Sequence, residues 1–146
     1  NAKNNTTVTG MQYKAAEGFT LAFQNGWEKE AYTNGKIWQV ATLRPGKYRL
    51  EVTYAYTMVV SDAGNFISAL MAKGNSESDI PNVADIEQLN GVCAIYDKAG
   101  INDDSGILVT PSFEVTETTD VVIGFLTSLA KGNSCFKVTE LKLILE

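Results

Sequence analysis

The stretch Lys36–Tyr56 limits the possible folds more than any other part of the sequence. From Tyr48 onward, apolar and polar side chains alternate, which is the pattern of a β-strand with one face on a core and the other in water. The residues expected on the buried face are Tyr48, Leu50, Val52, Tyr54 and Tyr56. Pro45-Gly46 precedes this run, and both residue types favour a chain reversal. The pattern therefore predicts a β-hairpin over Lys36–Tyr56.

The rest of the chain consists of similar short apolar runs separated by turn-forming residues. The further strands that we expect are Gly18–Gln24, Phe66–Ala72, Val92–Tyr96, a short one around Phe113-Glu114-Val115, Asp120–Leu129 and Ser134–Glu146. Only Val83, Ile86 and Leu89 have helical spacing, enough for one or two turns, and Ala99–Gly106 is predicted to be a loop. This organisation predicts an all-β fold, an eight-stranded antiparallel β-sandwich of the jelly-roll type.

The last strand changes its apolar phase. Phe136 and Val138 occupy even positions, whereas Leu141, Leu143 and Leu145 occupy odd ones. Because one extra residue moves every later side chain to the opposite face, the change predicts a β-bulge near Thr139-Glu140.

Size and composition restrict the function. A chain of 146 residues suffices for one domain with its own core, and we expect a flexible arm or linker at 1–10 and a single β-sandwich domain at 11–146. No apolar run is long enough to span a bilayer, and no signal peptide is recognised. The start at Asn1 without methionine predicts a processed or excised chain. The net charge of −5, without a basic cluster, argues against nucleic acid as a partner.

Two residue types are informative because they are scarce. The sequence contains no histidine, which excludes Ser-His-Asp and Cys-His catalysis and nearly every catalytic zinc site. Cys93 and Cys135 lie far apart in the sequence. Two buried free thiols are favoured, and a disulfide between the two residues is the alternative. We expect a protein that is not an enzyme, since only carboxylates, lysines and tyrosines remain for catalysis.

The topology predicts where a ligand could bind. In a sandwich of antiparallel strands the connections alternate between the two ends, so 25–35, 58–65, 98–106 and 131–133 should share one end. Sugar recognition needs an aromatic ring for the C–H face of a pyranose and amides or carboxylates for its hydroxyls. The candidate ligand-binding residues at this end are Trp27, Tyr32, Asp62, Asn65, Asn102, Asp103, Asp104 and Asn133. The alternative is that the aromatic residues pack over the sandwich edge and the polar ones form turns.

The residues at this end also allow two other chemistries to be weighed against sugar binding, a calcium site and a hydrolase site. Asn102–Gly106 is rich in oxygen ligands, as calcium requires, but it lacks the spacing of a calcium loop, so a solvated turn is favoured and no cofactor is expected. A hydrolase would need two carboxyl groups facing each other across a cleft, for example Asp62 with Asp103 or Asp104, and the sequence gives no sign of such a pair.

The region from Gly26-Trp27 through GKIWQVATLRPGKYRLEV resembles the galactose-binding-like jelly-roll domains of bacterial surface and periplasmic lipoproteins. The positions that match the pattern of these domains are Gly35, Lys36, Gln39, Leu43, Gly46 and Tyr48. Ile80-Pro81-Asn82 and the last three predicted strands also match, so the resemblance extends over Gly18 to Glu146. Thr139-Glu140 departs from it, since carbohydrate-binding relatives often have an Asp-Asn pair there.

In outline the chain is similar to the C-terminal domains of Bacteroidetes lipoproteins linked to polysaccharide utilisation. The resemblance implies a non-catalytic glycan-binding module at the cell surface, on the outer membrane or in the periplasm. Its partners would be a glycan or polysaccharide and the other domains of a parent lipoprotein. The alternative function is a structural or protein-docking domain without a glycan ligand. An exposed Trp27 would favour sugar binding, and a buried Trp27 would favour docking.

Overall fold

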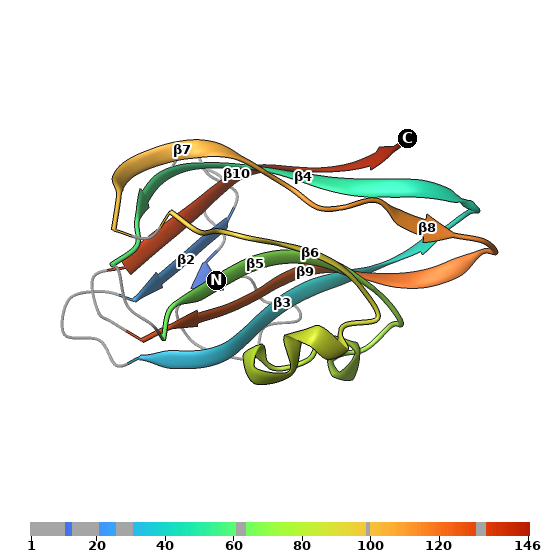
Figure 1. The fold of residues 1–146 in the computed structure, drawn as a ribbon, viewed down its shortest axis with the longest axis horizontal. Helices are drawn as coiled ribbons and strands as arrows, with labels where there is room; N and C mark the ends of the chain where they lie inside the picture. The colour runs from blue at the N-terminus through green and yellow to red at the C-terminus, as the bar shows by residue number, and fades with distance from the viewer. Residues whose placement is uncertain (1–10, 13–20, 26–30, 61–63, 99, 131–133) are drawn as a thin grey trace.

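The computed structural model describes residues 11–12, 21–25, 31–60, 64–98, 100–130 and 134–146, and these form two antiparallel β-sheets that lie face to face (Figure 1). The larger sheet contains, in spatial order, β1 (Met11–Gln12), β2 (Leu21–Asn25), β10 (Ser134–Leu145), β4 (Gly46–Met58) and β7 (Asn102–Val109), and β8 (Phe113–Val115) also pairs with β4. The smaller sheet contains β3 (Tyr32–Leu43), β9 (Thr119–Leu129), β5 (Phe66–Lys73) and β6 (Gly91–Ile95). The predicted arm at 1–10 lies outside the described residues.

The strand order is that of a jelly roll. Besides β1, with two residues, and β8, with three, the described part of the chain has eight strands of at least five residues. Numbered one to eight along the chain, these strands have the order 1-8-3-6 in the larger sheet and 2-7-4-5 in the smaller. Most connections therefore cross from one sheet to the other, as in the two Greek keys of a jelly roll. The predicted fold class is confirmed.

The predicted hairpin over Lys36–Tyr56 is wrong. β3 pairs with β9, whereas β4 pairs with β10 and β7, so the two strands belong to different sheets. The turn at Pro45 carries the chain across the sandwich, and the Tyr48 hydroxyl fixes this corner by donating to the carbonyl of Arg44 at 2.8 Å. Leu43 at the end of β3 and Leu50 in β4 reach the same buried cluster from opposite sides. Alternation specifies a buried face, but it does not specify which strand lies alongside.

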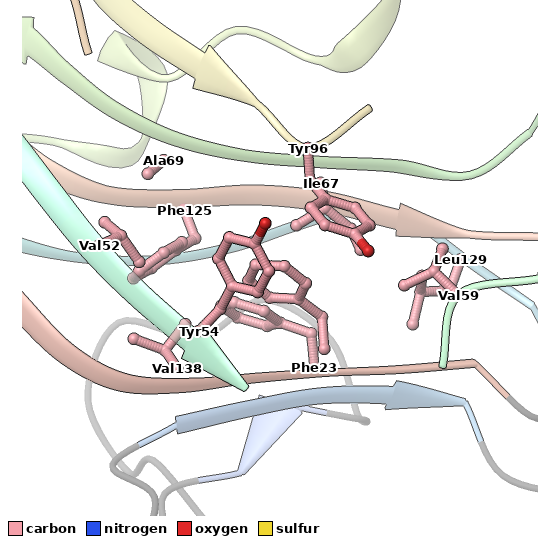
Figure 2. Close-up of a cluster of buried hydrophobic side chains, with 11 residues drawn as sticks. Phe23, Val52, Tyr54, Val59, Ile67, Ala69, Tyr96, Phe125, Leu129 and Val138 are labelled. Carbon is pink, nitrogen blue, oxygen red and sulfur yellow. The ribbon is translucent and has the colours of Figure 1, made fainter. Parts of the chain in front are cut away.

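The core between the sheets contains a group of aromatic rings (Figure 2). The ring of Phe136 is fully buried, and its centroid lies 5.1 Å from that of Tyr54 and 5.0 Å from that of Tyr96. Phe23 packs against Phe125 at 5.0 Å. Because buried aromatic rings combine large apolar areas with favourable edge and offset contacts, this group is the main source of cohesion at its end of the sandwich.

A smaller apolar layer covers the outer side of the smaller sheet. The 3₁₀ helices η2 (Glu77–Asp79) and η3 (Val83–Gln88) lie along this side (Figure 1). The apolar residues Val83 and Ile86 of η3, with Leu89 just after it, pack on a buried cluster of the sheet. This cluster contains Leu70, Val122 and Leu126, and Trp38 packs against it as well. The expected helical turns are confirmed, and Trp38 packs under them and outside the space between the sheets. No helix among the residues that the structure describes is long and apolar enough to cross a membrane.

Of two local predictions for the larger sheet, one is confirmed and the other is wrong. The predicted bulge in β10 is confirmed, because the register with β4 shifts between Val138 and Glu140 and leaves Thr139 as the extra residue. The predicted loop Ala99–Gly106 is wrong from Asn102 onward, where β7 begins. Its turn-forming residues are accommodated because the pairing with β4 is irregular there, with one register shift between Tyr54 and Thr57 and a second between Thr57 and Met58. Both cysteines are free thiols, as favoured, but each is half-buried where a buried position was expected.

Candidate functional site

The end of the sandwich predicted to bind a ligand is formed as the topology requires. β4 and β9 end there, and β3, β5, β7 and β10 begin there, on the left of Figure 1. Hydrogen bonds join these strand ends, for example from the amide of Val60 to the hydroxyl of Ser134 at 3.2 Å and from the amide of Gly100 to the carbonyl of Val59 at 2.6 Å. Of the candidate residues, Trp27, Asp62 and Asn133 lie outside the described part of the chain.

Two of the described candidates connect strand ends. The Asn65 side chain donates to the carbonyl of Val60 at 2.5 Å and accepts from the amide of Ala130 at 2.7 Å. The Tyr32 hydroxyl lies 2.9 Å from that of Thr127, and burial raises the pKa of Tyr32 to about 12. Both side chains therefore stabilise this end of the sandwich, and the Tyr32 ring packs against the core.

Asp104 belongs to a polar cluster inside the sandwich. Its Oδ2 accepts hydrogen bonds from the hydroxyls of Tyr54 at 3.2 Å and Tyr96 at 3.1 Å, and Lys98 Nζ lies 4.0 Å away. Burial, and after it the interaction with Asp104, raises the pKa of each tyrosine to about 12. The hydroxyl of Thr57, which is fully buried, lies 3.2 Å from that of Tyr96 and 3.4 Å from the Asp104 carbonyl. The carboxylate is thus directed at core tyrosines.

Among the described candidates, Asn102 and Asp103 are the ones that are exposed. Asn102 pairs with Met58 at the start of β7, and Asp103 has a left-handed backbone with φ of 53°. Asp is among the residues that tolerate this conformation best. Where the structure describes the chain, no three His, Cys, Asp or Glu side chains come together in a way that could hold a metal ion. The calcium alternative therefore gains no support from the described residues.

The structure also exposes an aromatic residue that the alternating sequence pattern predicted to lie in the core. The prediction that Tyr56 faces inward is wrong, because its side chain is 67% exposed and its φ is 58°. β4 pairs Tyr54 with Gly106 and Thr57 with Asp104, so Ala55 and Tyr56 together face the single residue Ser105. This bulge places Thr57 inside. One sequence signal was available, since the inward positions change from even at Tyr54 to odd at Val59, which is also buried.

Comparisons with known proteins place the chain in a family and identify a structure of similar fold. The chain belongs to the family described as domain of unknown function DUF5013, whose model matches residues 1–124. No curated protein matches the sequence significantly. Its fold is similar to that of TmCBM61, a carbohydrate-binding module solved in complex with β-1,4-galactotriose, with a TM-score of 0.54 and 12% sequence identity. The match covers 99% of this chain and 85% of that chain, and at this identity it concerns the fold.

Proposed function

We propose that this chain is a non-catalytic glycan-binding module. The observation that carries the proposal is the likeness of its jelly roll to TmCBM61, whose structure holds β-1,4-galactotriose, over 99% of the chain. The jelly roll is also the architecture of many lectin domains. The galactose-binding-like motifs around Gly35 and Gly46 support the same conclusion from the sequence.

The described end of the sandwich supports a division of roles among the candidate residues. Asn102 and Asp103 are exposed and could bind sugar hydroxyls, and the connections that contain Trp27, Asp62 and Asn133 start and finish at this end. We infer that these five residues contact the glycan. The other three, Tyr32, Asn65 and Asp104, would then act by holding the strand ends in place.

A non-catalytic role fits the chemistry of the chain. The sequence has no histidine, and Asp104 accepts two tyrosine hydroxyls within the sandwich, which is unsuited to a carboxylate that must face a glycosidic bond. We further propose that no cofactor is needed and that the domain belongs to a Bacteroidetes lipoprotein of the cell surface, outer membrane or periplasm that serves polysaccharide utilisation. Palmitate labelling and fractionation of the parent protein would test its location. Recovery in the cytoplasm without lipid would contradict it.

The test of glycan binding is a panel of polysaccharides and β-1,4-galactotriose, presented to the 146-residue chain with calcium and then with a chelator. We expect a specific ligand that is bound in both conditions and lost in the variant Trp27→Ala, provided that the variant keeps the circular dichroism spectrum of the wild type. Binding that survives this change would place the site elsewhere. Binding that requires calcium would contradict the absence of a cofactor.

One observation favours a second candidate function, a structural or protein-docking domain within a larger lipoprotein. Among the described strands β7 lies at the edge of the larger sheet, and it exposes Ile107 by 58% and Val109 by 49%. Exposed apolar side chains on an edge strand are typical of surfaces that pair with another polypeptide. A well-folded chain that binds no glycan would favour this function. An Ile107→Asp variant that loosens the domain from its neighbours in the parent protein, measured by limited proteolysis, would then support it.

A further inference from the structure

Tyr56 has two energetically unfavourable features, an aromatic ring exposed to water and a backbone with positive φ. Its side chain is 67% exposed, although Tyr56 is in phase with the buried Tyr54 two residues earlier. Its φ of 58° is a conformation that non-glycine residues rarely adopt, and a bulky residue there is an outlier. Such residues persist where the surrounding structure imposes them, and they concentrate at functional sites.

The buried polar cluster is what imposes this conformation. Thr57 takes the inward position that simple alternation would give to Tyr56, and its hydroxyl lies 3.2 Å from that of Tyr96 and 3.4 Å from the carbonyl of Asp104. Because Asp104 itself accepts from Tyr54 and Tyr96, β4 and β7 are fixed on both sides of the bulge. The bulge therefore presents the Tyr56 ring on the outer face of the larger sheet in a defined place.

Polar groups flank the ring on the neighbouring strands. On β10, Lys137 pairs with Ala55, and its Nζ lies 6.0 Å from the centroid of the Tyr56 ring. On β7, Ser105 is opposite the bulge and exposed, because Asp104 and Gly106 on either side of it face inward toward Tyr54. An ammonium and a hydroxyl on two sides of an exposed ring are groups that can bind sugar hydroxyls while the ring accepts the C–H face.

We propose that Tyr56 is the platform on which a pyranose unit of the glycan stacks, with Lys137 and Ser105 binding its hydroxyls. This proposal rests on the glycan binding proposed above, and it adds a site on the outer face of the larger sheet to the loop-end residues considered so far. The occupant is a sugar because the ring is flanked by hydrogen-bonding groups on both neighbouring strands.

The test compares variants of the 146-residue chain in binding to the best ligand of the polysaccharide panel, with β-1,4-galactotriose as the first probe. Tyr56→Gly removes the ring and suits the positive φ, so the bulge can be kept, and Tyr56→Phe keeps the ring without its hydroxyl. We expect Tyr56→Gly to lower the affinity by about tenfold or more and Tyr56→Phe to change it by less than about threefold. Val40→Ala, at an exposed apolar position on the smaller sheet, is the matched control and should bind as the wild type does.

The outcomes separate this proposal from the one on which it rests. If the wild type binds a glycan and Tyr56→Gly binds it equally well, the Tyr56 platform is wrong while glycan binding stands. Loss of binding in Tyr56→Gly but not in Trp27→Ala would place the ligand on the sheet face alone. A wild-type chain that is folded and binds no glycan overturns both proposals.

Discussion

Replacing Asp104 with alanine should destabilise the protein, because the carboxylate is a structural acceptor for two core tyrosines. Its side chain is only 15% exposed, and Oδ2 accepts from Tyr54 and from Tyr96. In Asp104→Ala the Tyr54 hydroxyl loses Asp104 Oδ2 as its acceptor. Leaving a buried donor unsatisfied costs about 1–3 kcal/mol. Tyr96 keeps contacts with Thr57 and with the carbonyl of Lys98, so its loss is about 1 kcal/mol.

The expected decrease in the free energy of unfolding is therefore about 2–4 kcal/mol, or roughly 5–15 °C in Tm for a chain of this length. Urea denaturation and calorimetry measure the two quantities. Asp103→Asn is the matched control, because it removes the same charge at an exposed neighbouring position that tolerates asparagine, and it should change stability by less than about 0.5 kcal/mol.

A double-mutant cycle tests the mechanism. Tyr54→Phe removes one donor and leaves Asp104 bonded to Tyr96, so it should cost about 1 kcal/mol alone. In the double variant no hydroxyl of residue 54 is left unsatisfied, and the loss should be smaller than the sum of the single losses by about 1–2 kcal/mol. Additive losses would refute the reasoning. Weaker glycan binding in Asp104→Ala at unchanged stability would also refute it, since Asp104 would then be a ligand-binding residue.

Three further perturbations have definite expected results. Phe136→Ala should cost about 3–5 kcal/mol in urea denaturation, because it empties the centre of the aromatic group, and Phe136→Leu should cost much less; equal losses would contradict a packing origin. Gly124→Ala should prevent stable folding, since its Cβ would collide with the backbone carbonyl of Ile37 in the neighbouring strand, and a soluble variant of wild-type Tm would contradict this. The unfolding free energy should fall as the pH rises from about 10 to about 12, because the unfolded tyrosines release protons near 10.0 whereas burial raises three folded pKa values to about 12. The three residues are Tyr32, Tyr54 and Tyr96. Urea denaturation at several pH values in this range measures the fall in unfolding free energy, and a flat profile would contradict the prediction.

The sequence predicted where the candidate site lies in the fold, but it did not predict the role of each candidate residue. Antiparallel strands alternate in direction, which predicted that β2, β4, β6 and β9 end on the same side of the sandwich. The structure shows this arrangement. The roles of Asn65 and Asp104 did not follow, because a polar residue near a strand end has the same appearance in a sequence whether it faces solvent or a buried tyrosine. Their partners, Ala130 and Tyr54, are 65 and 50 residues away along the chain.

By itself the sequence determined the fold class, the approximate position of the long strands apart from β7, and the bulge in β10. These features depend on the local period of apolar residues, which one strand reveals without its neighbours, as in Tyr48–Tyr54 and in the change of phase between Val138 and Leu141. Tertiary structure decided that β3 and β4 lie in different sheets, because a buried face can be covered from either sheet. It also decided that Tyr56 faces water, since only the hydrogen bonds joining Thr57, Tyr96 and Asp104 make an inward threonine more favourable than an inward tyrosine.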